Sequence, residues 1–76
     1  MTSAQMLTAL QALQPHARLV ITLDPTLTYV TVHYTNAFGW AQSGGVVARG
    51  APLHDVERMA CRCLDGALAI VTRRYG

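Results

Sequence analysis

The chain has 76 residues, which is enough for one domain and too few for a second hydrophobic core. Six arginines and four acidic residues leave a net charge of +2, well short of the strongly basic character typical of nucleic-acid-binding domains. Two cysteines cannot build a disulfide framework, and no run approaches the roughly 20 apolar residues of a membrane span. We expect a single domain over residues 1–76 and, because no signal-peptide pattern is recognisable, a cytoplasmic setting.

The first predicted element is a helix over residues 4–14. Ser3 is a suitable N-cap because its hydroxyl can accept a hydrogen bond from a backbone N–H, and Pro15 ends the helix. One face carries the apolar residues Met6, Leu7, Leu10 and Leu13. The segment has no charged side chain, so we expect tertiary packing to stabilise it.

Two strands are predicted next, over residues 18–23 and 28–35. The first alternates Leu19 and Ile21 with other residues, and the second is rich in the β-branched and aromatic residues that suit a pleated surface. The segment 24–26, Asp-Pro-Thr, predicts a turn between them, because proline is pre-set for the second position of a turn.

A third strand is predicted over residues 40–49, after a turn over residues 36–39. Asparagine and glycine in that turn tolerate the backbone angles that a tight reversal requires. Within the strand, Gly44 and Gly45 interrupt the pattern and indicate a β-bulge.

The last element is the clearest, a long helix over residues 52–74. Pro52 suits a first helical position, and Asp55 and Arg73 complement the two ends of the helix dipole. The apolar stripe comprises Val56, Met59, Ala60, Cys63, Leu64, Ala67, Ile70 and Val71. These residues recur every three or four positions, so we expect the stripe to be buried against a sheet.

The predicted architecture is α+β, in the order α-β-β-β-α, with a three-stranded antiparallel sheet. Both helices are one-sided, so we expect both to cover the same face of the sheet, the one that carries Val30 and Val32. The opposite face would then expose Tyr29, Thr31 and His33 to water or to a partner.

The sequence offers few groups for catalysis. Ser43 precedes two glycines, but no G-x-S-x-G motif surrounds it. His16 follows a helix-ending proline and His54 lies in the first turn of the long helix, where solvated positions are expected. His33 lies on the predicted strand, and a solvated strand residue explains it better than an acid–base role. We therefore expect no enzymatic activity.

Cys61 and Cys63 do not indicate a metal site. On a helix the two side chains are separated by about 200°, so one ion could not easily bind both. Cys63 belongs to the apolar stripe and is expected to fill space in the core, whereas Cys61 lies nearer the outer side and could be reactive. We expect neither a metal nor another cofactor.

The arginines of the long helix suggest a weak nucleic-acid surface. Arg58, Arg62 and Arg73 fall within about 60° of one another on the helix. Asp55 and Asp65 lie on the same strip, and alternating charges are typical of a solvated helix with salt bridges. The candidate nucleic-acid-binding residues are Arg58, Arg62, Arg73 and Arg74.

The element order resembles that of the double-stranded-RNA-binding domain, which also runs α-β-β-β-α over a similar length. In that family the second helix opens with a lysine-rich run that grips phosphates. Here the corresponding residues 52–57 read Pro-Leu-His-Asp-Val-Glu, with two acids and no lysine. The small pair inside that helix has a counterpart in Ala60 and Cys61. The resemblance implies a shared fold and, as an alternative function, weak nucleic-acid binding.

In size and character the chain also resembles the small inhibitor proteins that phages and mobile elements encode, of which anti-CRISPR proteins are the best-known group. That group shares no sequence motif, so no residue is carried over. The resemblance implies a non-enzymatic protein that occludes a surface of a larger host protein or ribonucleoprotein complex.

Our expectation from the sequence is a protein–protein interaction domain. Tyrosine and tryptophan are prominent in binding hot spots, which favours the exposed sheet face as the binding surface. The candidate partner-binding residues are Tyr29, Thr31, His33 and Trp40. A small domain with an open face and two free sheet edges is also expected to form a homodimer, through the face or through an edge strand.

Overall fold

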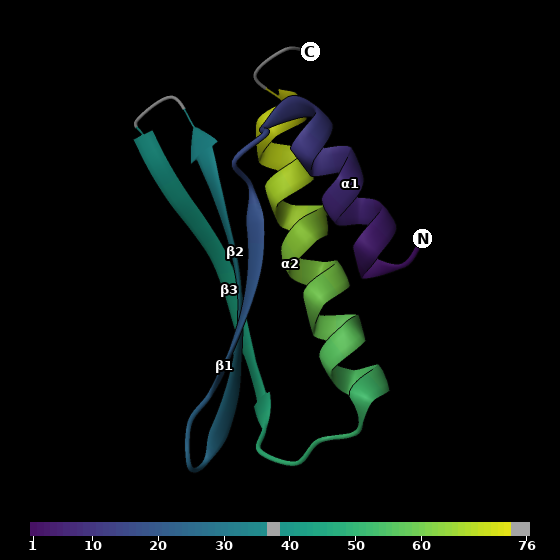
Figure 1. Cartoon of the computed structure of the whole chain (residues 1–76), viewed down its shortest axis with the longest axis vertical. Coiled ribbons are helices and arrows are strands. Elements are labelled where there is room, and N and C mark those ends of the chain that lie inside the picture. The colour runs from purple at the N-terminus through teal and green to yellow at the C-terminus, as the bar shows by residue number, and fades with distance from the viewer. Residues whose placement is uncertain (37–38, 74–76) are drawn as a thin grey trace.

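The computed structural model describes residues 1–36 and 39–73 and has the order α-β-β-β-α (Figure 1). The elements are α1 Ser3–Leu13, β1 Arg18–Leu23, β2 Leu27–Asn36, β3 Gly39–Ala48 and α2 Leu53–Arg73. Each differs from its predicted bounds by at most one residue at either end. The α+β class and the three-stranded antiparallel sheet are therefore confirmed.

The start of α1 differs from the prediction in its capping residue. Thr2 is the N-cap, and its side chain accepts a hydrogen bond from the N–H of Gln5 while the Gln5 side chain accepts one from the N–H of Thr2. This reciprocal pair is a capping box. Ser3, which we expected to be the cap, is instead the first helical residue, and its N–H and hydroxyl both donate to the carboxylate of Glu57 on α2.

The sheet is a meander in the order β1-β2-β3, with antiparallel pairing throughout. The turn predicted at residues 24–26 is present: the N–H of Asp24 donates to the carbonyl oxygen of Leu27 at 2.9 Å, and the Asp24 carboxylate accepts from Thr26. For the second turn, Ala37 and Phe38 lie outside the described residues. Gly39 follows them with a φ of 113°, a value that glycine adopts readily.

The bulge predicted at Gly44 and Gly45 is wrong. The register between β2 and β3 runs unbroken from Leu27↔Ala48 to Asn36↔Gly39. Gly45 has a different role, because a Cβ atom added there would collide with the sulfur of Met59 on α2. Gly45 makes room for the Met59 side chain between α2 and the sheet, so this glycine marks close packing and not an extra residue in the strand.

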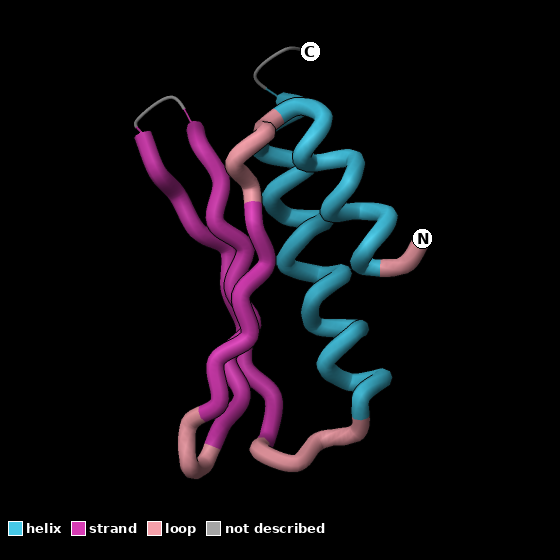
Figure 2. Tube along the Cα trace, viewed as in Figure 1, coloured by secondary structure: helices cyan, strands magenta, loops and turns pink. Residues whose placement is uncertain are grey.

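Both helices lie on the same side of the sheet, and no described helix lies on the other side (Figure 2). On the covered side of β2 the side chains of Val30, Val32 and Tyr34 are buried, as expected. The long helix α2 packs over β2 and β3, whereas α1 packs mainly against α2 and contacts the sheet mainly at β1. Most of the covered face of the sheet is therefore packed against α2.

The apolar stripe of α2 supplies much of the core. Its buried members are Ala60, Cys63, Leu64, Ala67 and Val71. Ile70, which we expected to be buried with them, is 42% exposed. On the helical wheel Ile70 lies next to Met59, at the edge of the apolar stripe. This edge is on the side of α2 that faces β3, and β3 is the last strand of the sheet. The sheet ends before it can cover this side chain.

Candidate protein-interaction surface

The side of the sheet that faces away from the helices is here called the open face. The register places thirteen residues on it, because opposite residues of an antiparallel pair point to the same side. They are Arg18, Val20, Thr22, Leu27, Tyr29, Thr31, His33, Thr35, Trp40, Gln42, Gly44, Val46 and Ala48. The four partner-binding residues expected from the sequence, Tyr29, Thr31, His33 and Trp40, therefore share one face.

Large side chains stand out from this face. Trp40 is 70% exposed, Val46 is 47% exposed and Tyr29 is 39% exposed. Val46 lies directly opposite Tyr29 across the β2–β3 ladder, so the two side chains form a cross-strand pair. An exposed tryptophan with a tyrosine–valine pair on the same sheet is typical of a binding surface.

A shallow hollow of about 240 Å³ lies at the Trp40 end of the open face, beside the edge of the sheet. Its lining residues are His33, Trp40, Ala41 and Gln42. His33 and Gln42 are direct partners in the register, and Trp40 is two residues from Gln42 on the same face. The half-buried imidazole and the exposed indole thus offer a polar and an apolar contact side by side.

The open face carries little charge. Among its described residues Arg18 is the one permanently charged side chain, and it lies opposite His33 across the β1–β2 ladder. Aromatic and small residues with few charges are characteristic of the centres of protein interfaces. A nucleic acid would need several cations on one surface, which this face lacks.

Sequence reasoning missed Val46, Gln42 and Arg18 as members of this surface. The assumed bulge in the third strand broke its alternation, so the face of Val46 relative to Trp40 could not be assigned. An uninterrupted alternation from Trp40 to Ala48 would have placed Val46 on the same side of the sheet as Trp40. Arg18 required the register of β1 against β2, which the sequence does not contain.

The residues weighed for catalysis are spread over the molecule. His16 is exposed after α1, His33 lies on the open face, and His54 lies at the start of α2, where its Nε2 is 3.2 Å from a carboxylate oxygen of Asp55. Ser43 is half-buried on the covered side of β3, beside Gly66 of α2. In the described part of the chain, none of the hydrogen bonds links Ser43 to a histidine.

The two cysteines have different environments. Cys63 is buried, and its sulfur lies 3.8 Å from the carbonyl oxygen of Val30, which confirms it as a core residue. Cys61 is half-buried, with its sulfur 3.6 Å from a carboxylate oxygen of Glu57. Burial, followed by the negative charge of Glu57, raises the pKa of the Cys61 thiol. A raised pKa leaves less of the thiol as thiolate, the nucleophilic form, at neutral pH, and the reactivity of Cys61 stays a prediction.

The described residues contain no group of three or more histidine, cysteine, aspartate or glutamate side chains that could hold a metal ion. Within 1–36 and 39–73, neither helix is long and apolar enough to cross a membrane.

The arginines of α2 form no salt-bridged strip. Arg58, Arg62 and Arg73 are exposed, and none of them makes an ion pair with a described carboxylate. The alternation with Asp55 and Asp65 predicted such pairs, so that expectation is wrong. Arg74, the fourth candidate for nucleic-acid binding, lies outside the described residues.

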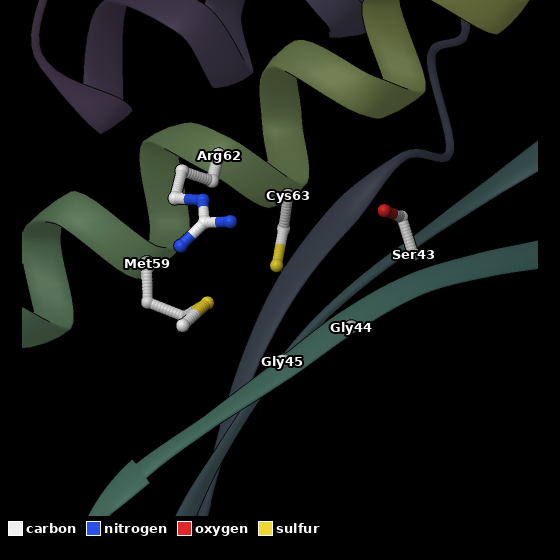
Figure 3. Close-up of a pocket in the computed structure, with 6 residues that line it drawn as sticks. All are labelled: Ser43, Gly44, Gly45, Met59, Arg62 and Cys63. Atoms are coloured by element: carbon white, nitrogen blue, oxygen red, sulfur yellow. The ribbon is translucent and has the colours of Figure 1, made fainter.

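A second hollow, of about 300 Å³, lies between α2 and the free edge of β3 (Figure 3). Met59, Arg62 and Cys63 extend from α2 toward the strand, and Ser43 extends from the strand toward α2. Gly44 and Gly45 form the strand side, and with no side chains they leave its backbone accessible. This hollow is separate from the open face, because it lies on the covered side of the sheet.

Scans against protein families, curated proteins and solved structures gave no match to this chain.

Proposed function

We propose that this chain is a non-enzymatic protein-binding domain that attaches its open face to a larger protein or ribonucleoprotein complex. The observation that carries the proposal is the exposure of Trp40 and of the Tyr29–Val46 pair on one sheet face that none of the described elements covers. Burying large apolar side chains of this kind is favourable, and they anchor many protein interfaces.

The narrower form of the proposal is an inhibitor encoded by a phage or mobile element, similar in kind to anti-CRISPR proteins. Its support is the small size of the chain and the absence of a catalytic or metal-binding motif from its sequence. Two free cysteines are in keeping with the reducing cytoplasm in which such an inhibitor would act. The partner would be a large assembly whose working surface the open face occludes.

Site-directed photo-crosslinking tests this proposal in the cell that expresses the chain. A photoreactive phenylalanine analogue replaces Tyr29 in one variant and Leu53 in a matched control, since Leu53 is also exposed but lies on α2. The expected result is a crosslink to one larger protein from position 29 and none to that protein from position 53. Equal crosslinking from both positions, or none from either, would overturn the proposal.

A further inference from the structure

The free edge of β3 lacks several of the features that usually protect a sheet edge. The strand has ten residues, carries no charged side chain or proline, and pairs with β2 without a bulge. The other edge, β1, has only six residues, begins with Arg18 and is followed by a turn containing Pro25. Long edge strands without charges or bulges invite pairing with another strand, so β3 is better suited than β1 to pair with a partner.

The outward-facing backbone groups of β3 can be assigned. The N–H of Arg49 donates to the carbonyl oxygen of Thr26 at 3.3 Å, in phase with the register of the β2–β3 ladder. Backbone groups alternate in direction along a strand, so odd-numbered residues of β3 face β2 and even-numbered residues face outward. Gly44 is the middle one of these outward-facing residues. A twofold axis at Gly44 would pair it with itself and place Trp40 opposite the small Ala48 of a second copy.

The side of α2 that lies beyond this edge is here called the α2 flank. Its residues recur every three or four positions and are Asp55, Met59, Arg62, Gly66, Ile70 and Arg73. Met59 lies over Gly45 and Gly66 lies beside Ser43, so α2 runs antiparallel to β3 with the flank along it. The same contacts place the middle of the flank above the middle of β3.

The α2 flank is complementary to itself when a second copy runs in the opposite direction. Asp55 then lies opposite Arg73, which pairs an acid with a base at both ends of the interface. Met59 lies opposite the exposed Ile70, an apolar pair. Arg62 lies opposite Gly66, so a long side chain meets a position without one. All three matches arise from one twofold axis, close to the middle of α2 and of β3.

The distances expected for such a pair also agree. Neighbouring strands of a sheet are about 4.8 Å apart, and α2 lies over both β2 and β3. Joining two copies through β3 would therefore bring their α2 helices to about 10 Å from each other, near the 8–10 Å typical of packed helices. One arrangement of two copies thus pairs the β3 edges and packs the two α2 flanks against each other.

We propose that β3 and the α2 flank form the interface of a twofold homodimer with a continuous six-stranded sheet. The hollow between Arg62 and the two glycines lies next to the axis, where the second copy packs (Figure 3). This interface uses the edge of β3 and the covered side of the sheet, whereas the open faces of the two copies would adjoin on the other side. Either proposal can therefore fail while the other stands.

Charge-swap variants test the dimer by light scattering on a size-exclusion column and by sedimentation equilibrium. The wild-type chain is expected at twice its monomer mass of 8.2 kDa at about 100 μM. Asp55→Arg and Arg73→Asp, each alone, should raise the dissociation constant about tenfold, because both symmetric ion pairs are lost and like charges meet. The double variant Asp55→Arg with Arg73→Asp should restore wild-type dimerisation. Circular dichroism verifies that each variant is folded.

The two single variants change the net charge in opposite directions, so a shared loss of dimer cannot come from net charge. Tyr29→Glu is the second control, because a charge on the open face should leave this dimer intact. A wild-type monomer up to about 1 mM, no recovery in the double variant, or dissociation of the dimer by Tyr29→Glu would each overturn the proposal.

Discussion

Glu57 joins the two helices of this small domain. Its carboxylate accepts hydrogen bonds from the N–H of Ser3, at 2.7 Å, and from the Ser3 hydroxyl, at the start of α1. A negative charge at this position also suits the positive end of the α1 dipole. These two hydrogen bonds, the hydroxyl contribution being the larger, lower the pKa of Glu57. The contact closes a separation of 54 residues, which is why no local pattern predicts it.

The lowered pKa of Glu57 predicts a loss of stability in acid. A carboxyl group whose pKa is lower in the folded state stabilises the fold above its unfolded pKa, and this contribution disappears as the pH falls through the folded pKa. We expect Glu57→Gln to melt below the wild type at neutral pH and the difference to shrink below pH of about 4.3. Hydrogen bonds from Thr26 also lower the pKa of Asp24, so the Glu57→Gln variant should still lose some stability in acid.

Thermal melts of both proteins between pH of about 7 and about 3 give the comparison. Melting midpoints that stay the same distance apart across the whole range would show that the charge of Glu57 does not stabilise the helix pair.

At the scale of elements, α2 organises the fold, because it packs on β2, on β3 and on α1. Its period of 3.6 residues predicts the buried stripe correctly for the central positions, including Leu64 and Ala67. The period fails at the margin, where Ile70 extends past the last strand of the sheet. A helical pattern gives the direction of burial, whereas the width of the covered stripe depends on how far the sheet extends beneath it.

Truncation of Leu64 tests the packing of α2. The side chain is fully buried, so Leu64→Ala should cost roughly 2–5 kcal/mol of unfolding free energy through lost apolar contacts and a residual cavity. Leu53→Ala is the matched control on the same helix, and its exposed side chain predicts a smaller effect. Urea unfolding of the three proteins measures both changes. If the two substitutions lowered the unfolding free energy equally, the face of α2 that carries Leu64 would not be the buried one.

For the whole molecule, most of the architecture could be predicted from the sequence, but the details of the surfaces could not. Short connections force neighbouring strands to be antiparallel, and alternation along β2 correctly separates Val30 and Val32 from Tyr29 and Thr31. The pairing of Tyr29 with Val46 requires an exact register, which the assumed bulge obscured. The stacking of α1 on α2 depends on long-range contacts such as the one to Glu57.

The charge distribution of the whole molecule predicts weak binding to nucleic acid at best. The net charge is +2, and Asp55 and Asp65 lie among the exposed arginines of α2, so few phosphates could be neutralised together. We expect no complex with duplex RNA or DNA at physiological salt and low-micromolar protein. Fluorescence anisotropy of labelled RNA and DNA duplexes, titrated with the protein, measures this binding. Binding tighter than about 1 μM that weakens steeply with added salt would favour the nucleic-acid function instead.

The most direct test of the central proposal is to measure how tightly the crosslinked partner binds a variant altered on the open face. Tyr29→Ala removes a large side chain from the middle of that face, whereas Leu53→Ala removes an even more exposed apolar side chain from α2. In titration calorimetry, the loss of Tyr29 should weaken binding about 10- to 100-fold, and the loss of Leu53 should leave it unchanged. If the Tyr29→Ala protein remains folded and binds the partner as tightly as the wild type, the open face is not the binding surface.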